Sequence, residues 1–270
     1  MSKTKYTYAV ARIRALEVSL LTNAVIEQLL ACKSAEQALQ LLVEKGWGDL
    51  TAGTLDADEV LNKEEEKVWQ TIREVAPDMH VFDVLSLPKL YHNLKAAIKE
   101  VCTEVENKNI FYDDCEISGE EMYAIVQNKE FDKLPGNMPA TAREAFDTLL
   151  HTRDGQLCDL IIDRATLEAM LEAGKKSGEK IIEEYAQTAV AIADIKIAVR
   201  SQKTGKNADF MKKAMVNCSE INVDQLTLAA LAGAEEIAQY LEGTSYREGA
   251  DALRISPSAF ERWCDNKMTD

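Results

Sequence analysis

The side chains best suited to acid–base or metal chemistry are few and widely spaced. The three histidines, His80, His92 and His151, are too far apart in sequence to predict a metal-ligand set or a catalytic pair. Only His92 has suggestive neighbours, Tyr91 and Asn93, and packing or hydrogen bonding at a helix start explains it more simply. The chain also lacks the H-E-x-x-H, P-loop, G-x-G-x-x-G and G-x-S-x-G motifs. We therefore predict no catalytic residues and no cofactor.

Two acidic clusters and one glycine–lysine segment are the remaining chemical candidates. The run Glu64–Glu66 falls within a predicted helix, where it would line a solvated face, and the pair Asp113-Asp114 lacks the staggered ligands of an EF-hand loop. A helical metal enzyme would need inward-facing acids from at least two helices, ideally with Glu-x-x-His pairs, and no such pair occurs. The segment Gly174–Gly178 superficially resembles a phosphate loop, but it follows a predicted helix rather than a strand. We predict no metal site, and a flexible joint at residues 174–178.

A repeated seven-residue pattern is more informative than any of these. Asn93–Lys99 (NLKAAIK) recurs 101 residues later as Asp194–Arg200 (DIKIAVR). Each copy is followed by a capping sequence, beginning at Ser118 (SGEE) and at Asn222 (NVDQ), in which the first side chain can accept a hydrogen bond from the amide three residues along. Two signatures in the same order predict a duplicated structural unit of about a hundred residues.

The polar members of this repeat are our candidate interaction residues. Each basic member precedes a strongly apolar turn, so we expect a partly buried stem whose charged head reaches a carboxylate or helix-end carbonyls. If the repeat is structural, Lys95 should superpose on Lys196, and Ser118 on Asn222. The candidates are Asn93, Lys95, Asp194, Lys196 and Arg200.

A fainter third copy of the capping sequence begins at Ser34 (SAEQ) and suggests three similar modules. We place module one at residues 1–88, module two at 89–190 and module three at 191–270. After the helix start at Ser256-Pro257 the sequence reaches its last residue, whereas module two continues from its corresponding helix into a further one. We therefore expect the third module to lack its closing C-terminal helix.

Composition and periodicity indicate an all-α fold. The 270 residues are rich in Ala, Leu, Glu and Lys, only 6% are aromatic, and no segment alternates convincingly as a strand. Apolar residues from Val10 to Ala24, spaced three and four apart, predict one long first helix. Pro77 and Pro88 are expected to bracket a short connection.

Charge and cysteine content exclude several classes of partner and compartment. The net charge of −15 disfavours nucleic acid and anionic membrane surfaces. The six cysteines show no C-x-x-C spacing and are expected to be reduced, as in a cytosolic protein. No stretch approaches the roughly 18–20 apolar residues that a membrane-spanning helix needs, so we expect no direct membrane span.

Four segments, taken in order, carry a family resemblance: residues 6–17 (YTYAVARIRALE), 91–95 (YHNLK), 193–200 (ADIKIAVR) and 260–266 (FERWCDN). Together they resemble the C-type subunit of the V/A-type rotary ATPases, which is the counterpart of the d-type subunit of eukaryotic V-ATPases. The likeness extends over nearly the whole chain.

The resemblance implies a funnel of three similar helical modules around a pseudo-threefold axis. Such a protein belongs to the central stalk, receives the D–F shaft of the rotor, and rests on the membrane ring of proteolipid subunits. It has no active site, lies on the cytoplasmic side, and couples ATP hydrolysis or synthesis to proton or sodium transport. The alternative is a generic cytosolic helical adaptor unrelated to ATPases, although the period near a hundred residues differs from the period of about 34 in a tetratricopeptide scaffold.

Overall fold

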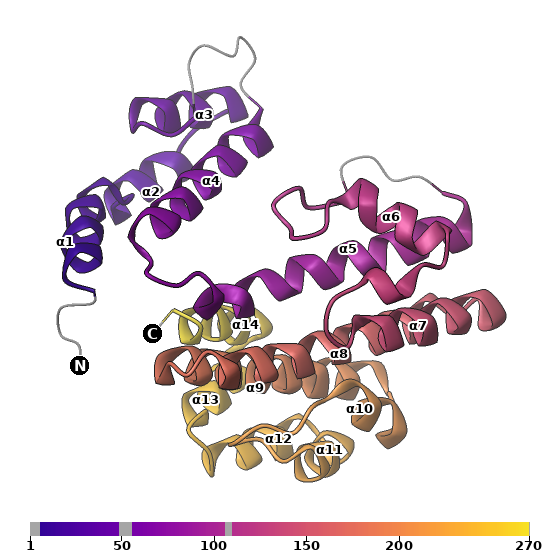
Figure 1. Ribbon diagram of the computed structural model, residues 1–270. Coiled ribbons are helices and arrows are strands. Elements are labelled where there is room, and N and C mark those ends of the chain that lie inside the picture. Colours follow the sequence, from indigo (N-terminus) through magenta and orange to yellow (C-terminus); the bar gives the residue numbers. More distant parts are fainter. Residues whose placement is uncertain (1–5, 49–55, 106–109, 270) are drawn as a thin grey trace. The chain divides into compact units, whose positions relative to one another are not determined.

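The computed structural model describes residues 6–48, 56–105 and 110–269, and every regular element in these ranges is helical (Figure 1). The all-α prediction is therefore confirmed. The chain divides into two compact units, the first ending at Met79 and the second beginning at His80. The arrangement of three modules as a funnel stays a prediction.

The first unit is a set of helices around few buried side chains. Ser34 begins one of them, because its Oγ accepts a hydrogen bond from the Gln37 amide at 3.3 Å. Among the described residues of this unit only three are buried, Ala9, Leu39 and Val60. Its elements are α1 (Thr7–Leu16), the 3₁₀ turn η1 (Glu17–Ser19), α2 (Asn23–Leu30), α3 (Ala35–Glu44) and α4 (Ala57–Val75).

The prediction of one long helix from Val10 to Ala24 was wrong. The chain leaves the helical conformation at Leu20, where ψ is 144°, and Thr22 then starts α2 by accepting a hydrogen bond from the Val25 amide at 3.4 Å. The apolar residues keep a spacing of three and four across this break, so their spacing does not mark where the first helix ends. Periodicity alone therefore could not locate the N-cap at Thr22.

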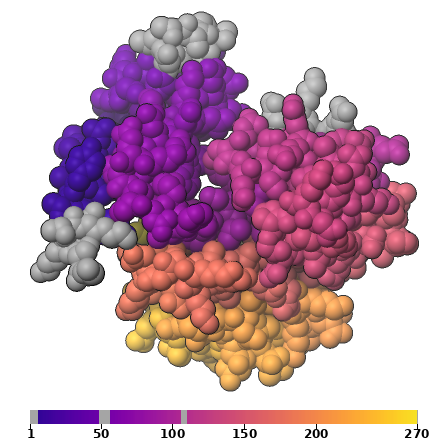
Figure 2. All heavy atoms as spheres, viewed as in Figure 1, coloured from indigo at the N-terminus to yellow at the C-terminus, as the bar shows by residue number. Residues whose placement is uncertain are grey.

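The second unit is organised around three long helices. Helices α5 and α8 pack together, and α8 in turn packs on α9. Helix α6 packs on α5, α10 packs on both α8 and α9, and α11 and α12 pack on α9 (Figure 1). In Figure 2 the orange residues of the later helices gather below the magenta residues of the earlier ones. The elements are η3 (His80–Phe82), α5 (Asp83–Thr103), α6 (Gly119–Gln127), η4 (Phe131–Lys133), α7 (Met138–Thr152), α8 (Gly155–Lys176), α9 (Lys180–Thr204), α10 (Ala208–Ala214), α11 (Val223–Ala232), α12 (Ala234–Glu242), α13 (Arg247–Ile255) and α14 (Pro257–Lys267).

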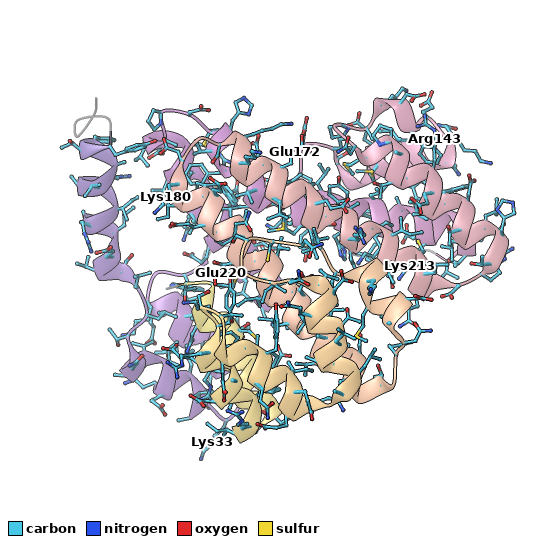
Figure 3. All side chains as sticks on the ribbon, turned by 90° about the horizontal axis from the view of Figure 1, so that it is seen from below. Lys33, Arg143, Glu172, Lys180, Lys213 and Glu220 are labelled. Carbon is cyan, nitrogen blue, oxygen red and sulfur yellow. The ribbon has the colours of Figure 1, made fainter. Side chains whose placement is uncertain are left out.

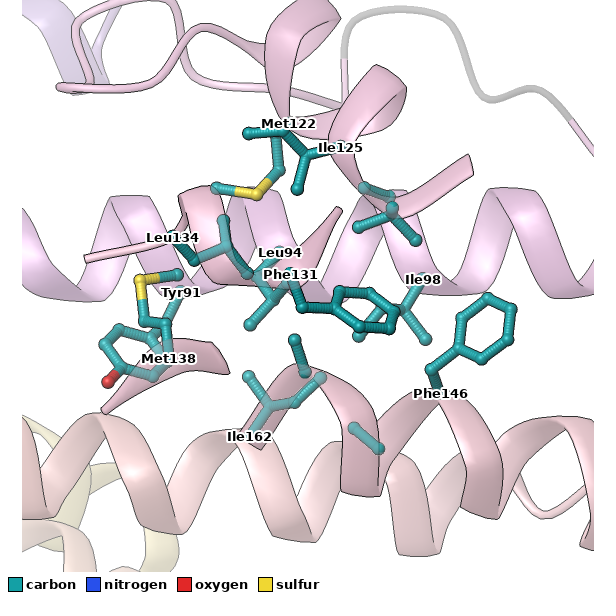
Figure 4. Packing of buried hydrophobic residues seen from close by; sticks show 14 of the residues in the cluster. Tyr91, Leu94, Ile98, Met122, Ile125, Phe131, Leu134, Met138, Phe146 and Ile162 are labelled. Atoms are coloured by element: carbon teal, nitrogen blue, oxygen red, sulfur yellow. The ribbon is translucent and has the colours of Figure 1, made fainter. Parts of the chain in front are cut away.

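Two main hydrophobic cores fill this unit, one for each copy of the repeated pattern. The first joins α5, α6, α7 and α8, and Leu94 and Ile98 of α5 lie fully buried at its centre (Figure 4). The second joins α9 with the helices that follow it, and Ile195 and Ala198 of α9 are fully buried there. A small third cluster around Val84 includes residues of α8 and α9. Helices α5 and α9 thus each carry a main core, and α8 contributes to that of α5.

Pro88 does not end a connection as predicted but lies inside α5. Its lack of an N–H removes one hydrogen bond from the second turn of the helix, and burial of the neighbouring Val84 and Leu90 stabilises the helical path through it. The predicted module boundaries at 88/89 and 190/191 fall within α5 and α9. The three-module division itself stays a prediction.

Candidate functional site

The first candidate, Asn93 of α5, fastens the segment before α6 to the long helix. Its Nδ2 donates to the Tyr112 carbonyl at 2.9 Å, and its Oδ1 accepts from the Tyr112 amide at 2.9 Å. The side chain has 0% exposure, so both ends of the buried amide need a partner, and both have one. Asn93 is therefore a fully satisfied structural clamp.

Asp194 of α9 makes the corresponding contact in the second copy. Its Oδ1 accepts from the Val216 amide at 3.1 Å. Val216 stands six residues before the N-cap Asn222, just as Tyr112 stands six residues before the N-cap Ser118. The two long helices therefore hold equivalent points of the segments that follow them.

The capping sequences are also equivalent in structure. Ser118 Oγ accepts from the Glu121 amide at 3.2 Å, and Asn222 Oδ1 accepts from the Gln225 amide at 3.0 Å. The residues before these caps, Ile117 and Ile221, are both buried. Local contacts thus repeat in the order that the sequence pattern predicts, with a long helix, an attached segment and a capped helix.

The two lysines of the pattern each reach a carboxylate on a later helix, as predicted. Lys95 pairs with Asp163 of α8. Lys196 pairs with Glu261 of α14 at 2.8 Å and lies 3.8 Å from Asp265. Their side chains are 22% and 31% exposed, so the stems are largely covered while the charged heads stay near solvent.

The electrostatics of Lys196 favour its charged form. Burial lowers the pKa of this amine, but the hydrogen bond to Glu261 and the charges of Glu261 and Asp265 outweigh it and raise the pKa. Helix α14 thus gives Lys196 the anionic partners that α8 gives Lys95. These contacts join helices that lie far apart in the sequence.

The expectation for Arg200 was wrong. This side chain is exposed, and no described residue forms an ion pair with it. Its counterpart Lys99 pairs with Asp159, the fifth residue of α8, at 2.6 Å. The fifth residue of α14 is Glu261, which is already bound by Lys196. The carboxylate that would have held Arg200 is therefore taken by the lysine.

The other chemical candidates have ordinary structural contacts. His92 Nε2 lies 2.9 Å from the Ile110 carbonyl, and its ring meets Tyr112 edge-on at 5.0 Å. Asp114 pairs with Lys89 at 2.7 Å, and Glu64 accepts from the Gly48 amide at 3.0 Å. These contacts explain the residues without invoking a ligand.

Neither the acidic residues nor the cysteines form a reactive cluster in the described part of the chain. No group of three or more His, Cys, Asp or Glu side chains there could hold a metal ion. Burial raises the pKa of the Cys264 thiol to about 12 and that of Cys158 to about 11. Buried thiols with such pKa values stay protonated and behave as small apolar side chains.

Sequence reasoning missed the role of Gly174, which it assigns to a flexible joint. Gly174 is buried within α8, and a Cβ placed there would lie 2.6 Å from the Ala186 Cβ of α9. The glycine allows these two helices to approach closely. The turn falls later, at Gly178, whose φ of +68° favours glycine.

Charged side chains cover the outside of the second unit. Arg143, Glu172, Lys180 and Lys213 are all exposed, and they come from four different helices (Figure 3). Acidic residues outnumber basic ones, 46 to 31 over the full chain.

Comparison with known proteins identifies the class to which this architecture belongs. Residues 9–270 match the family described as ATP synthase (C/AC39) subunit, and the chain belongs to that family. The chain is also similar to the C-type subunit of the V-type sodium ATPase of Enterococcus hirae, with 22% identity over 238 residues. The match covers 87% of this chain and 73% of that protein.

These findings agree with the resemblance noted in the sequence. Family and relative both indicate a C/AC39 component of V-type ATPases, an accessory rather than a catalytic subunit. Within the described residues, no helix is both long and apolar enough to cross a bilayer.

Proposed function

We propose that this chain is a non-catalytic central-stalk component that couples the D–F shaft of a V/A-type ATPase to its membrane ring of proteolipid subunits. The chain would sit on the cytoplasmic side and attach to the membrane through the complex. The proposal rests chiefly on the family match across residues 9–270.

The internal construction of the second unit supports a mechanical role. Helices α5 and α9 each have a main core, and polar clamps and ion pairs tie later elements back to them, as Asn93 and Lys95 do for α5. Close-packed interiors have low compressibility and transmit strain. A protein that passes torque between two partners needs this property and needs no catalytic side chain.

The charge of the chain indicates the chemistry of at least one contact. A net charge of −15 favours attraction to basic residues on a partner. Salt weakens such attraction, because the Debye length falls to about 8 Å at physiological ionic strength and to about 3 Å at 1 M.

Binding to a purified D–F shaft assembly tests this proposal directly. We expect the chain to bind the assembly in low salt, and the association rate to fall steeply as NaCl rises from about 50 to about 500 mM, both chosen as assay conditions. An uncharged osmolyte at matched osmolarity is the control and should leave the rate nearly unchanged. A chain that binds neither the D–F shaft assembly nor the proteolipid ring would contradict the proposal.

A further inference from the structure

Asp194 differs from its counterpart Asn93 in one respect that packing alone does not explain. Both side chains have 0% exposure, and both accept a hydrogen bond from a backbone amide in the segment that follows their helix. Asn93 also donates to the Tyr112 carbonyl. Asp194 Oδ2 is buried and has no hydrogen-bond partner among the described residues.

A carboxylate cannot make the second bond of this clamp, because it only accepts hydrogen bonds. A buried acceptor without a partner is costly, and a buried charge is costlier still. A protonated carboxyl group, however, carries one donor and one acceptor, as the amide of Asn93 does. Protonation on Oδ2 would therefore give Asp194 the donor and acceptor pattern of its counterpart.

The groups around Asp194 do not supply a dedicated counter-ion. Arg164 of α8 is the charged group that lowers the pKa of Asp194. Cys218 of the following segment and Tyr240 of α12 also lie near Asp194, and after burial its charge is among the causes that raise their pKa values. The Arg164 guanidinium is already engaged, since its Nε donates to Glu168 at 2.9 Å. Its NH1 donates to the carbonyl at the end of α10, that of Lys212, at 2.9 Å.

Burial is the largest influence on this carboxyl group. It raises the pKa of Asp194 from 3.8 to about 7, against the opposing effects of the Val216 amide and the Arg164 charge. The direction follows from taking a charge out of water without pairing it. This shift agrees with the geometry of the unpartnered Oδ2.

We propose that Asp194 is held as a neutral carboxylic acid whose Oδ2 proton is donated to the backbone carbonyl of Val216, which makes residues 215–222 a pH-responsive clasp on α9. Residues 215–222 have other anchors as well, since the side chains of Met215 and Ile221 are buried in the second core and Glu220 Oε2 accepts from the Ser245 amide at 3.1 Å. Ser219 N donates to Gln187 Oε1 of α9 at 2.8 Å, and Asn222 N donates to the Tyr240 hydroxyl of α12 at 2.9 Å. Loss of the proton would break one bond at Val216 and leave a buried charge beside the other.

The sign of the pH dependence follows from proton linkage. The folded chain binds the Asp194 proton more tightly than the unfolded chain does, since the pKa is about 7 against an ordinary value of 3.8. The contribution of Asp194 to the free energy of unfolding is therefore fully present below its ordinary pKa of 3.8, and it is lost as the pH rises to about 7. Above the folded-state pKa the loss is complete, because both states are then ionised.

Two reciprocal substitutions in the full chain test the clasp. Asp194→Asn supplies the donor permanently and should remove the fall in stability between about pH 5 and pH 8, values chosen for the assay. Asn93→Asp places the same ionisable group in the equivalent clamp and should create a second pH-dependent loss. Urea unfolding at several pH values measures both.

A local readout separates the clasp from general effects of pH. The ratio of hydrogen-exchange rates of the Val216 and Tyr112 amides should rise by about tenfold from about pH 6 to pH 8 in the wild type, since each pH unit below a pKa near 7 corresponds to tenfold. The ratio should stay flat in Asp194→Asn. A wild-type pH dependence that persists unchanged in Asp194→Asn would overturn the proposal.

Carbon-13 NMR of the wild-type carboxyl groups keeps the test decisive if a variant does not fold. The proposal predicts one aspartate that titrates near neutral pH, and assignment to Asp194 confirms it. An Asp194 carboxyl group that titrates in the ordinary acidic range, including one held ionised by a bound cation, would contradict it.

Discussion

At the scale of single residues, the repeated pattern is a set of attachments between elements. Asn93 and Asp194 hold backbone segments, and Lys95 and Lys196 hold later helices. The sequence predicted that the lysines would reach carboxylates, because a basic group before an apolar turn tends to keep its head near solvent and its stem covered. It could not name their partners, since these come from helices that lie far along the chain.

Arg200 shows why the residue-level prediction was incomplete. The pattern matches Arg200 to Lys99. Local spacing, however, could not predict that Lys196 rather than Arg200 would pair with Glu261 of α14. The protonation of Asp194 is hidden in the same way. An acid in place of an amide is visible in the sequence, but its burial and unpartnered oxygen appear only in the fold.

Replacing Lys196 with Met should destabilise the second unit modestly. The substitution keeps an apolar stem but removes the ion pair to Glu261, which is worth about 0.5–1 kcal/mol for a partly exposed pair. The matched variant Arg200→Met, on the same helix, should change the free energy of unfolding by less than about 0.5 kcal/mol. Urea unfolding measures both, and high salt should narrow the difference. Equal losses from the two variants would argue against a stabilising role for the ion pair.

At the scale of helices, composition and periodicity predicted the class of every element but placed some of their ends wrongly. An apolar stripe continues through the break at Leu20, and a proline lies within the second turn of α5. At Leu20 the local cap at Thr22 overrides the apolar periodicity, whereas at Pro88 packing outweighs the local signal. The caps at Ser34, Ser118 and Asn222 were predicted correctly because capping depends on contacts only three residues apart.

Close approach of α8 and α9 depends on Gly174. Gly174→Ala should lower the free energy of unfolding, because overpacking costs about 1–3 kcal/mol and exceeds a gain of about 1 kcal/mol in helix propensity. Gly155→Ala, at the other end of α8, is the control, since a Cβ there meets nothing within 4 Å. It should leave stability unchanged or raise it. Thermal unfolding compares the two variants, and a Gly174→Ala protein as stable as the control would show that α8 and α9 separate without cost.

At the scale of the whole molecule, the sequence was sufficient for the fold class and the family. The all-α class followed from composition and periodicity, and the family resemblance agreed with the match over residues 9–270. The arrangement of the modules was not within reach of sequence reasoning, because helical periodicity describes each element's faces and not how separate units are placed. The repeated pattern also could not predict the boundary between Met79 and His80, because its first copy begins only at Asn93.

The central claim is that this chain couples ATP hydrolysis to ion transport, and reconstitution tests it most directly. The ATPase is assembled in vesicles with and without the chain, and ATP hydrolysis and ion uptake are measured together. We predict that removal of the chain abolishes ATP-driven uptake while the catalytic part still hydrolyses ATP, and that adding the purified chain restores uptake. Ion transport that stays coupled to ATP hydrolysis in the complete absence of the chain would contradict the account.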